Sequence, residues 1–565
     1  MSTDLVDDLE SFEVDEERKH VLIKIMKTKS GVVKKESDHN VMISKFKFKW
    51  NKQIQSKRVE LYNLKNADCQ KVFKEMTSCG DSLSAIFDNE KDLNKSTKLF
   101  MKKLDDIVKC CFRKIRVCDK QNKEVEDLFT RRRELRNKDD DQSKIELKEV
   151  EMKLAELCAE ENYKKIKDEI SNIKCEEGGI NSGQLWKLKK KLNPKCRDPP
   201  TAMMDSEGNL ITSPHLIENL ALDVFRERLQ NRPMRKDLLK MKEMKEDLCK
   251  LRLKRARDNK TPPWTMEQLE TVLKYLKKNK SRDPFGYANE IFAEDVAGKD
   301  LKLATLKLMN RIKFEQLFPE VLENCDISSI YKLKGNKNDF NSYRGIFRVP
   351  ILRAILDRLI YNDEYKTVDE AMSDSNVGAR KGRNIRDNIF VLNAVMNSVV
   401  NGKEEPIDVQ VFDVEKCFDA LWVQECINDL YDSGFDNDKL PLLFLENQNA
   451  NIAVKTPNGT SKRVSISNII MQGTVWGSLC CTASMDKLGK LVYNNADLLY
   501  KYKGEVDIPS LGMVDDILSI QRCSSDSVKM NAVVNAFIES KKLTLSKANV
   551  TEFILKRSKP RPKNA

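Results

Sequence analysis

Two adjacent aspartates stand in the middle of an otherwise apolar stretch, LGMVDDILSI, and few folds accept such a pair. Apolar residues flank Asp515 and Asp516 on both sides. If these flanking residues form a hairpin, the two carboxylates lie at its tight turn, where the core holds them together although their charges repel. A bound divalent cation removes that repulsion, and oxygen ligands without His or Cys favour Mg²⁺. An ordinary Asp-Asp turn between two strands is the alternative.

The composition places this pair in a folded, helix-rich chain. Of the 565 residues, 40% are hydrophobic and 33% are charged, so the chain can form a core. The 20 Gly are about half the usual share, which argues against a turn-rich all-β array. The net charge is +13, with basic clusters at 131–133, 274–282 and 556–563. Such clusters suit contacts to a phosphate backbone, and a solvated helix face or tail is the alternative for each.

The N-terminus and the cysteines limit where the protein works. The first residues are acidic where a signal peptide needs a basic start and an apolar run, and no stretch resembles a transmembrane helix. We therefore expect a soluble, intracellular protein, nuclear or cytoplasmic, that is not secreted and contacts no membrane. The 15 cysteines are scattered without a Cys-x-x-Cys pair, and the chain has 3 histidines. Reduced thiols are therefore expected rather than a zinc site.

The character of the sequence changes along the chain. Residues 1–50 contain two strand-like runs, HVLIKI and NVMISKFKFKW, separated by loop and turn residues, TKSGVVKKESDHN. Residues 51–260 are highly charged and predict helices, including one through Leu216 and Phe225 that follows a hairpin-like MDSEGNLITS. Beyond residue 260, helical segments alternate with β-rich runs such as ISSIYKL, DVQVFDV and KRVSISNII. This mixture predicts an α+β domain.

A third carboxylate ends one of these apolar runs. In VQVFDVEKCFD the predicted strand ends at Asp413, and Asp419 follows in the same segment. If this strand lies beside the hairpin, Asp413 and Asp515 meet in space. Their oxygens would then form a cage for two metal ions, which promotes in-line phosphoryl transfer.

These carboxylates lie in segments that resemble the motifs of reverse transcriptases. DVEKCFD (413–419) resembles motif A, MQGTVWG (471–477) resembles motif B, and MVDD (513–516) resembles motif C. Three upstream segments, KNKSRDPFGYANEIF, ISSIYKLKGNKNDFNSYRGI and SDSNVGARKGRNIRDNIFVLN, look like finger motifs of non-LTR (LINE-type) retrotransposon reverse transcriptases. The six segments occur in the family's order.

The resemblance implies a right-hand polymerase fold of α+β class. Fingers are expected at 261–400, and a palm with an antiparallel sheet and flanking helices at 401–550. A charged helical connector at 51–260 would precede the fingers, and a basic tail at 551–565 would follow the palm.

The resemblance also implies metal ligands. Asp413 and Asp515 would bind two Mg²⁺ ions, or Mn²⁺ in their place, with Asp516 beside them. The carbonyl of Val414 would be available to the metal on the nucleotide side. The ions would lower the pKa of a primer 3′-OH and neutralise charge on the leaving pyrophosphate.

Further residues are implied to bind the incoming nucleotide. Phe418 stands where the family places an aromatic side chain that excludes a 2′-OH, with a core phenylalanine as the alternative. Arg344 matches the arginine that grips the triphosphate, and Lys332 would assist it. Gln472 and Gly473 match the turn that approaches template and nucleotide, where glycine allows a close approach.

Both ends of the sequence depart from the family's pattern. Lys547, in LTLSKAN, stands where motif D carries a lysine, with a surface lysine as the alternative. The residues beyond it are too few for a helical thumb, and a partner chain is one way to supply it. SDHN resembles the closing motif of an apurinic-endonuclease-like domain, to which Asp38 and His39 would belong. Residues 1–50 are too few for that domain and are interpreted as its remnant, in a chain truncated at both ends.

The sequence thus predicts an RNA-directed DNA polymerase of a non-LTR retrotransposon. It would transfer nucleotides from dNTPs to a primer 3′-OH, with template RNA and a DNA primer or target as partners. The alternative is a catalytically inactive, retrotransposon-derived remnant that binds nucleic acid and lacks a thumb. A purely structural helical protein would leave the motifs unexplained.

Overall fold

The computed structural model describes most of the chain beyond residue 61. Described are residues 62–112 and 202–555, except 65, 212, 231–235, 457–458, 509, 523 and 546–550. Strands between residues 9 and 46 and scattered positions between 128 and 180 are described as well. The chain divides into two compact units, Met1–Arg58 and Val59–Ala565. Within the described residues, no helix has the length and apolarity needed to cross a membrane.

The N-terminal unit contains two antiparallel strand pairs. β1 (Leu9–Val14) pairs with β4 (Met42–Phe46), and β2 (Ile23–Thr28) pairs with β3 (Gly31–Glu36). The strands predicted in HVLIKI and NVMISKFKFKW are present as β2 and β4. The loop predicted between them is wrong over β3, because consecutive β-branched valines in GVVKKE favour an extended backbone that pairs with β2. Asp38 and His39 lie outside the described residues.

Three helices open the second unit: α1 (Ala67–Met76), α2 (Ile86–Asn89) and α3 (Leu93–Cys111). α3 begins at Asp92, whose carboxylate accepts a hydrogen bond from the Lys95 backbone N–H at 3.0 Å. Buried residues recur along α3 at intervals of three or four, at Leu93, Thr97, Phe100, Leu104 and Val108. This helix packs against α10 (Lys299–Glu315) and against α1 and α2.

A five-stranded sheet forms the next layer, in the order β10-β9-β12-β13, with β14 also paired to β12. Its strands are β9 (Asn324–Tyr331), β10 (Tyr343–Arg348), β12 (Asn449–Thr456), β13 (Gly459–Thr460) and β14 (Val464–Ser467). β9 and β10 pair antiparallel, whereas β9 and β12 pair parallel. α7 (Pro214–Gln230) contacts this sheet and buries Ile217 and Phe225 with it. This is the helix predicted through Leu216 and Phe225, and the predicted hairpin before it is present as β7 (Met203–Met204) and β8 (Leu210–Ile211).

A second sheet has four strands, all antiparallel, in the order β17-β18-β11-β19. They are β17 (Leu511–Met513), β18 (Asp516–Gln521), β11 (Ile407–Phe412) and β19 (Thr551–Leu555). On one face, α12 (Ile385–Val400) packs Val395 and Val399 against the sheet. On the other face, Ser527 of α17 (Ser524–Ser540) donates a hydrogen bond to Asp408 at 2.8 Å. β19, expected at the start of a basic tail, is an edge strand of this sheet.

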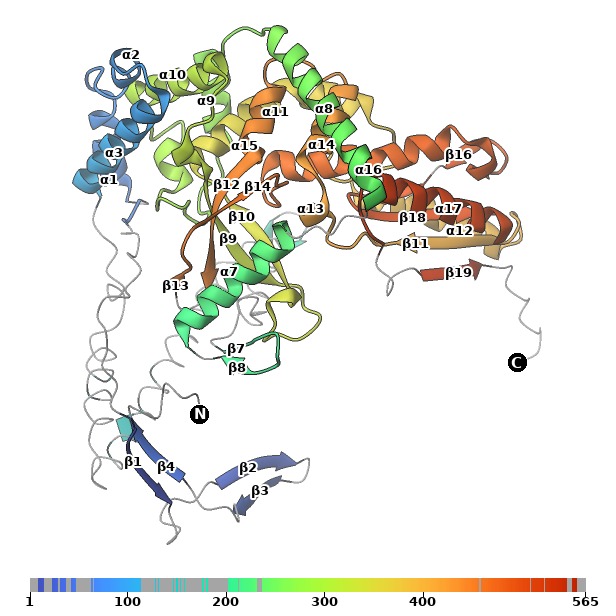
Figure 1. Ribbon diagram of the computed structural model, residues 1–565, viewed down its shortest axis with the longest axis horizontal. Coiled ribbons are helices and arrows are strands. Elements are labelled where there is room, and N and C mark those ends of the chain that lie inside the picture. Colours follow the sequence, from blue (N-terminus) through green and yellow to red (C-terminus); the bar gives the residue numbers. More distant parts are fainter. Residues whose placement is uncertain are drawn as a thin grey trace. The chain divides into compact units, whose positions relative to one another are not determined.

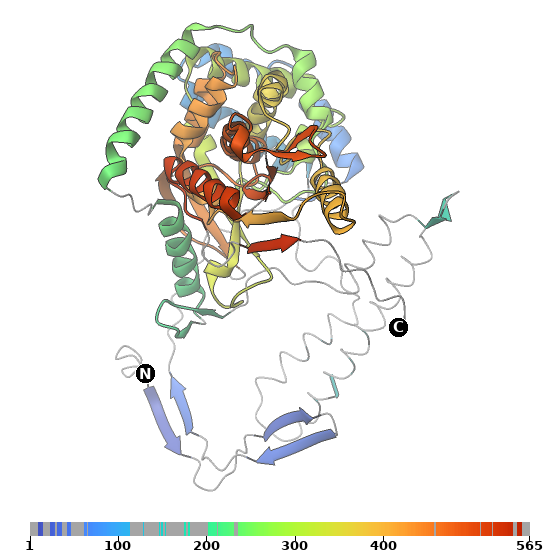
Figure 2. The ribbon, with the colours of Figure 1, turned by 90° about the vertical axis from the view of Figure 1, so that its right-hand side faces the viewer.

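Helices fill the centre of the unit: α11 (Ile351–Ala371), α14 (Val423–Asp432), α15 (Leu440–Gln448) and α16 (Val475–Tyr493). The buried ring of Trp476 stacks on Phe435 with centroids 5.6 Å apart and donates a hydrogen bond to the Asp357 carbonyl at 3.1 Å. α8 (Lys236–Asp258) runs along the outside of these helices and contacts α14 and α15 (Figure 1 and Figure 2). The predicted α+β class is confirmed, and helices and antiparallel sheets of this kind are consistent with the fingers and palm of a polymerase.

Candidate active site

The adjacent aspartates lie at a tight turn, as the sequence predicted. Val514 and Asp515 connect β17 to β18, and Met513 pairs with Asp516 across the hairpin. Asp515 is half-buried and Asp516 is exposed. Val514 has φ +63°, a left-handed conformation that is rare for a β-branched residue. The turn therefore holds its carboxylates on a strained backbone.

Asp413 lies beside this turn. The last pair between β11 and β18 joins Phe412 to Ile517, so Asp413 follows β11 next to the position where β18 begins with Asp516. Burial, together with the charges of Asp516 and Asp413, raises the pKa of the Asp515 carboxyl to about 6. Desolvation, followed by the charge of Asp413, also raises the pKa of Asp516. The three acids thus lie close enough to repel one another.

The mutual repulsion of the three aspartates bears on whether they suit a metal ion. As they stand, the described residues include no group of three or more His, Cys, Asp or Glu side chains that could hold a metal ion. Asp413 and Asp515 nevertheless offer two partly buried oxygen donors whose mutual repulsion a divalent cation would remove. Val414 follows Asp413 and is buried, and its backbone forms an isolated antiparallel bridge with Leu545. The donor set fits a hard cation such as Mg²⁺.

Two cationic side chains of the β9–β10 hairpin act electrostatically on the acids. Arg344, exposed on β10, lowers the pKa of both Asp515 and Asp516 through its charge. The structure thus brings the arginine that was singled out in the sequence into the field of the aspartates. Lys334 in the hairpin loop also lowers the pKa of Asp516. The sequence did not identify Lys334 as a site residue, because nothing distinguishes it from the other lysines in KLKGNK.

Lys332 belongs to a second cluster of positive charge. Its ammonium donates a hydrogen bond to the Asn341 carbonyl at 3.2 Å. Burial lowers the pKa of Lys332, and repulsion from Arg228, Lys416 and Arg344 lowers it further. Such a concentration of positive charge beside carboxylates suits the binding of a polyphosphate.

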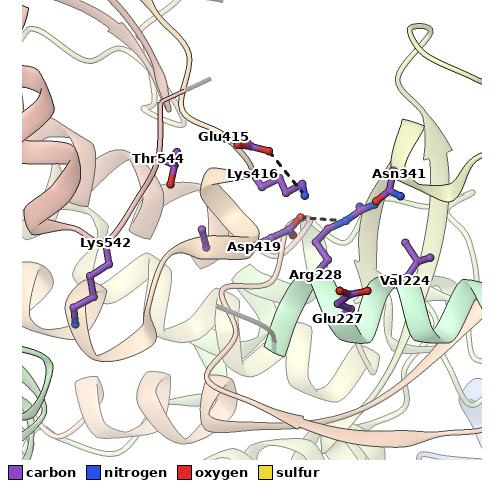
Figure 3. A pocket seen from close by; sticks show the side chains of 10 residues that line it. Val224, Glu227, Arg228, Asn341, Glu415, Lys416, Asp419, Lys542 and Thr544 are labelled. Atoms are coloured by element: carbon purple, nitrogen blue, oxygen red, sulfur yellow. Dashed lines mark ion pairs between the residues drawn. The ribbon is translucent and has the colours of Figure 1, made fainter. Parts of the chain in front are cut away.

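A cavity of about 580 Å³ opens beside this cluster, lined by α7, α13 (Cys417–Ala420) and the residues that follow α17. In Figure 3, Arg228 of α7 and Asp419 of α13 point toward each other across the cavity, with Nε 3.9 Å from Oδ2. Lys416 and Glu415 form an ion pair at 4.0 Å on the same side. The cavity therefore presents both signs of charge.

Arg228 was not singled out in the sequence. Its side chain is buried, and its guanidinium donates hydrogen bonds to the carbonyls of Tyr343 at 2.9 Å and Phe340 at 3.2 Å. Burial lowers the pKa of Arg228, whereas Asp419 and Asp339 raise it. Arg228 thus connects α7 to the start of β10, the strand that carries Arg344. Nothing in FRERLQ distinguishes this arginine from the other one in the same helical turn.

The motif B turn packs against the same strand. The carbonyl of Gln472 accepts a hydrogen bond from the Phe347 backbone N–H at 2.9 Å. Gly473 has φ +114°, and a Cβ at this position would lie 3.0 Å from both Ile346 Cγ2 and the Phe347 carbonyl oxygen. Glycine is therefore required here both by the backbone conformation and by the close approach.

The remaining residues singled out in the sequence are placed differently. Phe418 is half-buried: part of its side chain packs against the main hydrophobic core, and the rest is accessible. Lys547, like Asp38 and His39, lies outside the described residues.

Comparisons with known proteins give the class of this domain. Residues 335–559 match the model of the family described as reverse transcriptase (RNA-dependent DNA polymerase). Over these residues the chain is similar to reverse transcriptase domains. Among solved structures, an apo telomerase of Candida tropicalis truncated from its C-terminal domain matches with a TM-score of 0.31 and 11% sequence identity. That match covers 43% of this chain and 53% of the telomerase chain. A search among curated proteins found no match.

Proposed function

We propose that this chain is an RNA-directed DNA polymerase of the non-LTR retrotransposon type, with fingers at 261–400 and a palm at 401–550. The observation that carries the proposal is the meeting of Asp413 with the Asp515–Asp516 turn opposite Arg344. Partly buried acids facing an arginine are the arrangement that divalent ions and a nucleoside triphosphate together require.

Roles follow for the residues of this site. Asp413 and Asp515, with the Val414 carbonyl, would hold Mg²⁺ or Mn²⁺, which lowers the pKa of the primer 3′-OH and neutralises charge on the pyrophosphate. Arg344 and Lys332 bind and orient the triphosphate as a bidentate fork and a point charge.

Two further positions would shape the nucleotide site. Gln472, in the turn at Gly473, positions the template and the incoming base. Phe418 stands against the sugar. Template RNA, a DNA primer or target and dNTPs are the substrates.

The test is incorporation of dTTP on an oligo(dT)-primed poly(rA) template with Mg²⁺. We expect incorporation by the wild-type chain, loss of it in Asp515→Asn, and no change in Asp497→Asn, which alters an exposed aspartate of the short helix after α16. Equal incorporation by wild type and Asp515→Asn would refute the proposal. Primer-template binding that weakens with salt, without any incorporation, would instead indicate a binding remnant.

A further inference from the structure

The turn that carries Asp515 depends on one strained peptide. Val514 has φ +63°, and branching at Cβ makes this conformation unfavourable. A valine released from outside restraint would return to a negative φ. That change would rotate the peptide between Val514 and Asp515 and move the Asp515 carboxylate.

Asn376 supplies a restraint on both sides of Val514. The backbone N–H of Val514 donates to Asn376 Oδ1 at 3.0 Å, and Asn376 Nδ2 donates to the Val514 carbonyl at 2.9 Å. Asn376 is buried, so water competes little for these bonds. Oδ1 also accepts a hydrogen bond from the Gly378 N–H at 3.0 Å, which fixes the orientation of the amide.

The backbone around Asn376 lies against the hairpin like an added strand. Asn376 and Gly512 form a parallel bridge, in which the Val377 N–H donates to the Gly512 carbonyl at 3.0 Å and the Gly512 N–H donates to the Ser375 carbonyl at 2.6 Å. A Cβ on Gly378 would lie 2.4 Å from the Val514 backbone nitrogen, so only glycine permits this approach.

The segment is itself anchored to the helices behind it. Arg380 is buried, pairs with Asp369 of α11 at 2.7 Å, and donates a hydrogen bond to the Asn376 carbonyl at 3.1 Å. Ser373 donates a hydrogen bond to Asp486 of α16 at 2.5 Å. Asn376 therefore holds Val514 from a rigid support and not from a free loop.

We propose that Asn376 is a positioning residue of the active site, whose amide holds Val514 in its left-handed conformation and so fixes the Asp515 carboxylate for metal binding. The inference rests on the proposed function, because it takes Asp515 as a metal ligand. Asn376 acts through the Val514 backbone, as residues that orient metal ligands from behind do.

The test measures Mn²⁺ affinity by electron paramagnetic resonance, which needs no turnover. Asn376→Ala should weaken Mn²⁺ binding by roughly 10- to 100-fold, the range typical for loss of a group that orients a metal ligand. Adding Val514→Gly to this variant should restore most of the affinity, because glycine adopts a positive φ without restraint at the first position of such a turn. A merely structural role would not produce this rescue.

Asn388→Ala is the matched control. Asn388 is also buried and donates a hydrogen bond to the same hairpin, at the Gly512 carbonyl, with a length of 2.9 Å. We expect this variant to lose thermal stability and keep its Mn²⁺ affinity, with no gain from Val514→Gly. If Asn376→Ala does not fold, Asn376→Asp keeps the acceptor and loses the donor, and it should bind Mn²⁺ with reduced affinity.

The outcomes separate this inference from the proposed function. Wild-type Mn²⁺ affinity in the folded Asn376 variant, or failure of Val514→Gly to restore affinity, would overturn the positioning role of Asn376. The proposed polymerase function would still hold if the wild type incorporated dTTP. Mn²⁺ binding through Asp515 without any dTTP incorporation would refute the polymerase function and leave the positioning role of Asn376 intact. A wild-type chain that binds no Mn²⁺ would overturn both.

Discussion

Replacing Gly473 by alanine should damage the nucleotide site from a position that carries no functional group. An alanine at φ +114° occupies a sparsely populated conformation, which costs roughly 1–3 kcal/mol. The new Cβ would also lie 3.0 Å from the Phe347 carbonyl oxygen, a backbone atom that cannot rotate away. The turn must then move from β10 and stretch the 2.9 Å hydrogen bond between Gln472 and Phe347, which is worth about 1 kcal/mol.

The displacement acts on the strand that carries Arg344. We therefore expect Gly473→Ala to lower the free energy of unfolding by about 2–4 kcal/mol in urea denaturation. For each 1.4 kcal/mol by which nucleotide binding weakens, the KM for dTTP should rise by about tenfold in the poly(rA) assay.

Gly504→Ala provides the control for backbone strain alone. Gly504 has φ +75°, but a Cβ there would meet no atom within 4 Å. This variant should lose about 1 kcal/mol of stability and keep the wild-type KM. The reasoning is refuted if Gly473→Ala retains the wild-type KM, or if both variants raise it equally.

Three further predictions concern buried charge and metal binding. Glu446 is fully buried, and desolvation and then Asp357 raise its pKa well above the ordinary value, so the folded state loses stability as pH rises above about 4.5. Glu446→Gln should flatten the decline of unfolding free energy with pH in urea titrations, and an unchanged slope would contradict this. Lys541→Met removes a 2.6 Å ion pair from buried Asp429 and should cost about 3 kcal/mol, seen as a lower Tm; an unchanged Tm would contradict it. Mg²⁺ should raise the Tm of the wild type but not of Asp515→Asn, and an equal rise in both would place the ion elsewhere.

Local patterns in the sequence predicted much of the fold. Short β-rich runs identified the strands that became β9, β11 and β14, and the apolar flanks of Asp515 identified the hairpin. These signals are short-range, since they depend on the period of a strand or on the residues of one turn. The segment GVVKKE was predicted to be a loop, because its glycine and two lysines outweighed the strand preference of its two valines.

The contacts that organise the site follow no such pattern. Asn376 and Val514 are 138 residues apart, and a lone asparagine in SDSNVGAR gives no sign of the peptide it restrains. Arg228 and Asp419 likewise meet only after α7 docks on the sheet that carries Arg344. The strain at Val514 comes from its positive φ, a conformation that a valine disfavours and that its sequence therefore does not predict. Such features appear only when distant segments are folded together.

Anomalous diffraction from crystals soaked in Mn²⁺ would test the central claim most directly, because it locates the ion without relying on turnover. Our account predicts a manganese peak with oxygens of Asp413 and Asp515 as ligands at distances on the order of 2 Å. The peak should disappear in crystals of Asp515→Asn. A peak bound elsewhere, or the two carboxylates held too far apart to share an ion, would contradict the proposed polymerase centre.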